Sequence, residues 1–168
     1  MKKNLLSALL GALASLALFG IAFFALDQSH IEKFLPDSKL ESYIYFPMLI
    51  VGPVCAITAH ELGHLFTGLA LGQRFKLLVV TFLGIAEEAG KIKIFFNTNM
   101  GYFGGIAATV PQTTASIDHR VFAKILMAGP LTSLGYGILC MWMFFQFDSA
   151  FNSFFALSGL TSIGLFLA

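Results

Sequence analysis

The chain has 168 residues, of which 57% are hydrophobic and 11% are charged, and its formal net charge is +1. A soluble domain of this size carries about a quarter charged residues, so the composition predicts an integral membrane protein. The near-neutral charge offers no basic surface to a nucleic acid; we expect a lipid bilayer and no nucleic acid among its partners. The two cysteines, Cys55 and Cys140, lie in apolar runs without a CxxC spacing, which indicates packing residues.

Four apolar segments have the length and composition of transmembrane helices. The first, about residues 5–26, carries no charge, and at about 1.5 Å per residue it is long enough to cross a bilayer core. Lys2 and Lys3 precede it, so a signal peptide is the alternative, but the apolar run is longer than a signal peptide requires. The other three segments are about residues 43–71, 121–147 and 150–168.

The region between the second and third apolar segments carries strand signals instead. Residues 75–85 are rich in Leu, Val, Thr and Phe, residues 91–94 alternate Lys and Ile, and a Gly-containing turn separates them. This pattern predicts a β-hairpin over about residues 75–96, followed by a Gly-rich loop at residues 101–105. We therefore expect a mostly α, polytopic membrane protein. It would form a single membrane domain over residues 1–168, with about four transmembrane helices and a β-hairpin inserted between helices two and three.

Basic residues predict the orientation, because cytoplasmic loops carry an excess of Lys and Arg. Two lysines precede the first helix, five basic residues lie between helices two and three, and two lie in the opposite connector. We therefore expect a multi-pass integral protein of a bacterial cell membrane, with its amino terminus and hairpin in the cytoplasm. The residues counted are Lys2 and Lys3; Arg74, Lys76, Lys91, Lys93 and Arg120; and Lys33 and Lys39.

The strongest chemical signal is the run His-Glu-Leu-Gly-His at residues 60–64, in the second apolar segment. Glu61 is the only formally charged side chain within residues 43–71, and ionisable groups inside a membrane segment mark functional sites. Residues four apart lie on one face of a helix, so His60 and His64 can bind one Zn²⁺. Glu61, one step round the helix, can reach a zinc-bound water and act as its base. In the alternative interpretation, the three side chains only make structural hydrogen bonds to other helices.

On these residues the sequence resembles the site-2 protease family of intramembrane zinc metalloproteases. The resemblance rests on the run from Ala59 to His64, and on Ala-Gly-Pro-Leu at residues 128–131 in the next apolar segment. It implies a zinc metalloendopeptidase, with Zn²⁺ as cofactor, that hydrolyses peptide bonds in or beside the transmembrane segments of a membrane protein or peptide substrate. His60 and His64 would be metal ligands and Glu61 the catalytic residue that activates a zinc-bound water. The active site would lie toward the cytoplasmic side.

A third zinc ligand is not evident in this pattern. The resemblance implies an Asp of an Asp-Gly pair in a later helix, and the chain has no Asp-Gly. We therefore expect the ligand beyond Ala168 and the chain to be C-terminally truncated. Asp118 and His119 are the alternatives at the right depth, whereas Asp148 is expected at the opposite end of its helix. A smaller departure is Ser133, where the family often has Asn.

Two other hypotheses about function stay open. A catalytically inactive relative that binds membrane protein partners would keep the motif without a third ligand. An ion path through the histidines needs polar residues on several facing helices, and the first and third apolar segments are too apolar for it.

If the protein is a protease, an unwound substrate segment needs new hydrogen-bond partners for its backbone. We expect the substrate segment to pair, as an added strand, with the free edge of the 75–96 hairpin.

Overall fold

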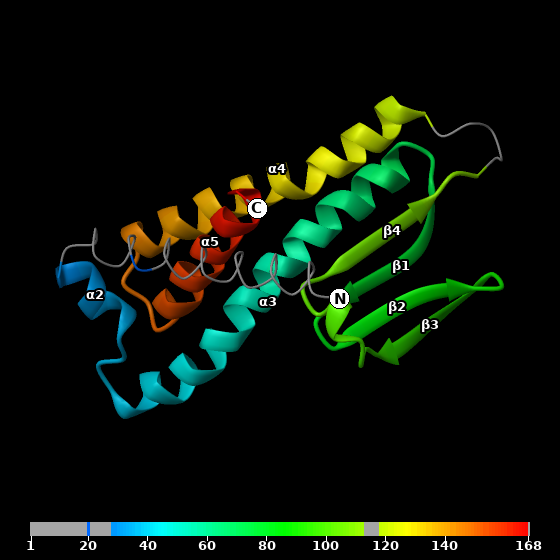
Figure 1. Ribbon diagram of the computed structural model, residues 1–168. Coiled ribbons are helices and arrows are strands. Elements are labelled where there is room, and N and C mark those ends of the chain that lie inside the picture. Colours follow the sequence, from blue (N-terminus) through cyan, green and yellow to red (C-terminus); the bar gives the residue numbers. More distant parts are fainter. Residues whose placement is uncertain (1–19, 21–27, 113–117, 168) are drawn as a thin grey trace.

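The computed structural model describes Gly20, residues 28–112 and residues 118–167 (Figure 1). Over these ranges the chain is mostly helical, with a small antiparallel sheet inserted between its two long helices. The first predicted transmembrane helix, residues 5–26, lies outside the described residues except for Gly20, so it stays a prediction.

The segments predicted around residues 43–71, 121–147 and 150–168 are confirmed as helices, with small shifts at their ends. Helix α3 begins earlier than predicted because Ser38 caps it: its hydroxyl accepts a hydrogen bond from the Glu41 N–H at 3.2 Å. The elements in chain order are α2 (Gln28–Phe34), α3 (Lys39–Ala70), β1 (Arg74–Val80), β2 (Leu83–Glu88), β3 (Lys91–Phe96), the 3₁₀ turn η1 (Met100–Tyr102), β4 (Ile106–Val110), α4 (His119–Gln146) and α5 (Asn152–Leu167).

Two of the described helices, α3 and α4, are long and apolar enough to cross a membrane, and α5 is a shorter apolar helix. The three pack together, with α3 between α4 and α5 on one side and the sheet on the other (Figure 1). Small residues bring the helix axes close. A Cβ on Gly63 of α3 would lie 2.8 Å from the Ala128 carbonyl oxygen of α4, and one on Gly52 would lie 3.2 Å from the Phe154 carbonyl oxygen of α5.

The sheet corrects the prediction of one hairpin over residues 75–96. Its strand order is β3-β2-β1-β4, and residues 75–85 form parts of two strands rather than one. The chain turns at Thr81 and Phe82, with Val80 paired to Leu83. The buried Asn97 side chain supports this turn by donating to the Thr81 carbonyl oxygen at 2.8 Å.

The sequence pattern does not predict strand β4. It is only five residues long and includes two alanines, so its sequence carries little strand preference. It is a strand because it pairs with β1 along most of its length. This places β4 at the edge of the sheet nearest α3, and β3 at the opposite edge.

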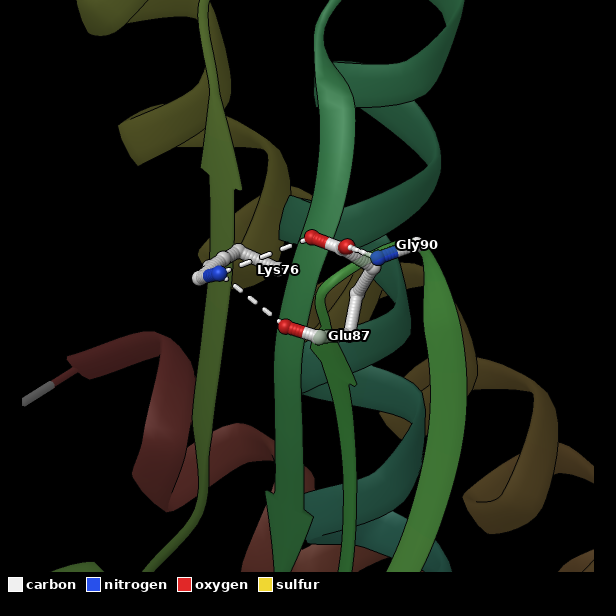
Figure 2. Close-up of polar contacts among 3 residues, drawn as sticks. All are labelled: Lys76, Glu87 and Gly90. Atoms are coloured by element: carbon white, nitrogen blue, oxygen red, sulfur yellow. Dashed lines mark hydrogen bonds and ion pairs between the residues drawn. The ribbon is translucent and has the colours of Figure 1, made fainter.

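The turn between β2 and β3 has positive φ at both of its central residues, 51° at Ala89 and 76° at Gly90, as a type I′ hairpin turn requires. Glu87 braces this turn. Its carboxylate accepts the Gly90 N–H at 2.6 Å and lies 3.5 Å from Nζ of Lys76 on β1, as Figure 2 shows. The hairpin is therefore tied to the middle of the sheet by an exposed ion pair.

Candidate metal centre

The two motif histidines converge on one point beside α3. His60 and His64 lie one helical turn apart, and their Nε2 atoms are 3.2 Å from each other. Two nitrogens bound to one tetrahedral zinc, at about 2.0–2.1 Å each, lie about 3.3 Å apart. The spacing between the two rings therefore fits a shared metal ion.

Helix α4 holds the other nitrogen of each ring. Nδ1 of His60 is 2.8 Å from the Ser133 hydroxyl, and Nδ1 of His64 is 2.6 Å from the Ile125 carbonyl oxygen. A carbonyl oxygen only accepts hydrogen bonds, so Nδ1 of His64 must carry a proton. In the neutral ring this leaves the lone pair on Nε2, which is the atom that faces His60. Outer partners of this kind orient metal-binding histidines in known sites.

The Ala-Gly-Pro run lies against the second histidine. A Cβ on Gly129 would overlap the His64 ring, with Nε2 as the nearest atom. The absence of a side chain at this position thus makes room for the nitrogen that faces His60. Pro130, next to it, lacks the N–H that would bond to a carbonyl one turn earlier in α4. The structure therefore brings the two sequence motifs together at a single place.

Glu61 lies on a different side of α3, toward the sheet. Successive residues of an α-helix are about 100° apart, which turns Glu61 away from α4. Its side chain is 6% exposed and accepts a hydrogen bond from the Ala107 N–H of β4. A Cβ on Gly105 would lie 2.5 Å from its Oε1 atom. The start of β4 is thus the part of the sheet that contacts the motif.

The candidate third ligands do not join the histidines. Asp118 caps α4, where its Oδ1 atom accepts the Arg120 N–H at 2.9 Å, and His119 is exposed at the first residue of that helix. Asp148 pairs with Lys33 at 2.8 Å, beyond the far end of α4. Among residues 28–112 and 118–167, no group of three or more His, Cys, Asp and Glu side chains is arranged to hold a metal ion.

A polar cavity of about 390 Å³ lies at the other end of the helix bundle, where α3 begins. Charged side chains of α2 and of the link between α4 and α5 line it, and none of its lining residues belongs to the histidine motif. This cavity is therefore separate from the candidate metal centre.

The sequence motif singles out His60, Glu61 and His64 but does not indicate the groups on α4 and β4 that contact them. In the sequence Ser133 stands out only as a departure from a family pattern, and Ile125 contacts His64 through its backbone, which leaves no sequence signal. Comparisons of the chain with protein-family models, with curated proteins and with solved structures found no match.

Proposed function

We propose that this protein is a zinc metalloendopeptidase that cuts peptide bonds in or beside transmembrane segments. The observation that carries the proposal is the convergence of His60 and His64 at 3.2 Å in an apolar helix, with their other ring nitrogens held by α4. The carboxylate of Glu61 is buried in the next position of that helix. Polar groups are costly inside a membrane, so three of them within residues 60–64 of one apolar helix favour a functional site.

The residues of the chain have separate tasks in this proposal. His60 and His64 supply two ligands for the ion. A bound zinc ion polarises a carbonyl oxygen and makes water more acidic. Glu61 takes a proton from the attacking water and passes it to the leaving amine. The Ala107 N–H holds the carboxylate on the sheet side, so the base is positioned by β4, whereas the two histidine rings are held by α4.

Strand β4 is a better candidate for substrate binding than the hairpin proposed from the sequence. The free edge of that hairpin is β3, which lies across the sheet from α3, whereas β4 contacts α3. A membrane-spanning substrate must unwind before its carbonyls are accessible, and the unwound backbone needs hydrogen-bond partners. Strand addition beside β4 would supply them next to Glu61.

The same proposal places the protein in a membrane as a multi-pass chain. Helices α3 and α4 cross the bilayer, and the basic residues near the sheet put that end in the cytoplasm. His60 and His64 then lie in the cytoplasmic half of α3, which gives water a short path to the site.

A second candidate is a catalytically inactive relative that binds membrane protein partners. The observation in its favour is that only two metal ligands come together among residues 28–112 and 118–167. An inactive relative should bind metal weakly and cleave nothing, whereas the protease must both bind zinc and cleave its substrate.

The proposal is tested by measuring the zinc content of the purified protein and its variants and their cleavage of a transmembrane substrate. Wild type should bind zinc, and His60→Ala should lose it, because the remaining ring cannot hold the ion alone. His119→Ala, at an exposed histidine of α4, is the matched control and should bind zinc like wild type.

Glu61→Gln should keep the zinc of wild type and lose cleavage of a transmembrane substrate by at least about 100-fold, as expected for loss of a general base. If wild type binds zinc but does not cleave, the inactive relative is the better description. Normal cleavage by Glu61→Gln would exclude the proposed base.

A further inference from the structure

The two hydrogen bonds from α4 to the histidine rings differ in one chemical property. The Ile125 carbonyl oxygen can only accept, so it fixes the proton of His64 on Nδ1. The Ser133 hydroxyl can both donate and accept, so it is compatible with a proton on either nitrogen of His60. Ser133 is 0% exposed, so its hydroxyl does not face water.

Without a metal ion, the 3.2 Å between the Nε2 atoms constrains the protons further. If both neutral rings were protonated on Nδ1, two lone pairs would face each other at hydrogen-bonding distance. The conflict disappears when His60 carries its proton on Nε2 and donates it to Nε2 of His64. The Ser133 hydroxyl then donates to Nδ1 of His60, and every polar atom of the group has a partner.

A metal ion requires the other arrangement, because it needs the lone pairs of both Nε2 atoms. The proton of His60 must then be on Nδ1, where the Ser133 oxygen accepts it. The ring remains neutral in both states, and only the direction of the Ser133–His60 hydrogen bond reverses.

We propose that Ser133 is a positioning residue that lets His60 exchange its tautomer when a metal ion binds. The inference rests on the proposed metal site. Ser133 satisfies the histidine pair in the metal-free protein and presents both Nε2 lone pairs to the ion in the loaded protein. A carbonyl at this position would force two lone pairs together in the metal-free state, and an apolar side chain would leave a half-buried ring nitrogen without a partner.

The first experiment determines directly which ring nitrogen of each histidine carries the proton. The ring nitrogens of ¹⁵N-histidine-labelled protein in detergent are observed by NMR at about pH 8, where histidine side chains are ordinarily neutral. In the metal-free protein we expect His60 protonated on Nε2 and His64 on Nδ1. After zinc is added, both should be protonated on Nδ1. A metal-free His60 protonated on Nδ1 would overturn the inference.

The second experiment measures zinc affinity by competition with a chelator. Ser133→Ala should weaken binding about 10–100-fold, the usual cost of losing an outer partner of a metal-binding histidine. Ser133→Thr, which keeps the hydroxyl, should restore most of it.

Ser162→Ala is the matched control, because Ser162 of α5 is equally buried and its hydroxyl has no partner among the described residues. Equal zinc affinity of Ser133→Ala and wild type would contradict the role of Ser133. A wild type that binds no zinc would instead overturn the metal site itself.

Discussion

At the residue scale, two of the motif side chains, His64 and Glu61, each lie against a glycine from another part of the chain. Gly129 of α4 makes room for the His64 ring, and Gly105, before β4, makes room for the Glu61 carboxylate. The two contacts are separate, so they offer a way to disturb metal binding and the base independently.

Replacement of Gly129 by Ala should disrupt metal binding. The new methyl group would overlap the His64 ring and push Nε2 away from its partner. We expect the zinc affinity, measured by chelator competition, to fall at least about tenfold. Gly135→Ala is the control on the same helix, because a Cβ there meets nothing within 4 Å. Wild-type affinity in Gly129→Ala would mean that His64 is not held as described.

Replacement of Gly105 by Ala should affect the base and spare the metal. Gly105 has a φ of 102°, which disfavours any side chain, and its Cβ would contact Glu61. We expect near-normal zinc content and cleavage reduced about 100-fold, since a small displacement of a reacting group is costly. Gly104→Ala, where a Cβ meets nothing within 4 Å, should cleave like wild type. Loss of zinc in Gly105→Ala would contradict this separation of roles.

At the element scale, the sheet divides into a β4 edge that contacts the helix bundle and a β2–β3 hairpin that projects from it.

The carboxylates of Glu87 and Glu88 form hydrogen bonds that stabilise the hairpin. The Gly90 N–H, together with Lys76, holds the pKa of Glu87 below its ordinary value, and a hydrogen bond from Lys93 does the same for Glu88. The contribution of such carboxylates to stability is present above their unfolded pKa and is lost as the pH falls through the lower folded value.

The hairpin should therefore loosen in acid, below about pH 4. The amide shift of Gly90, followed by NMR, should titrate with a midpoint below the ordinary Glu pKa of about 4.3, because Glu87 is its acceptor. Glu87→Gln should remove the titration and leave the metal centre unchanged. A midpoint at or above the ordinary Glu value in wild type would show that the bonds in Figure 2 do not stabilise the carboxylate.

At the scale of the whole molecule, α3 connects two ends of different character. Its beginning lies beside α2 and the polar cavity, and its end leads into the sheet. If α3 crosses a membrane with the proposed orientation, the first end is outside the cell and the second is in the cytoplasm.

Labelling of single cysteines in intact cells tests this orientation. Lys39 is the first residue of α3 and Arg74 follows its end; both are exposed, so each is replaced by Cys in a chain whose Cys55 and Cys140 are alanine. A membrane-impermeant maleimide should label Lys39→Cys and should not label Arg74→Cys until the cells are opened. The opposite pattern would reverse the proposed orientation, and equal labelling of both would argue against a span.

The sequence alone determined the features that depend on local chemistry. Apolar length predicted the helices around residues 43–71, 121–147 and 150–168, and a four-residue spacing placed His60 and His64 on one helix face. These inferences hold because helix periodicity and hydrophobicity act over a few neighbouring residues, and the chain itself carries that information.

Only the tertiary structure decided what surrounds the motif. β4 is a strand because β1 pairs with it, and Ser133 reaches His60 from 73 positions away in the chain. The turn at Thr81, which divides the predicted strand, depends on support from Asn97. Contacts between distant segments depend on how helices and strands pack in space, and no local pattern of residue types encodes which backbone group will meet which ring nitrogen.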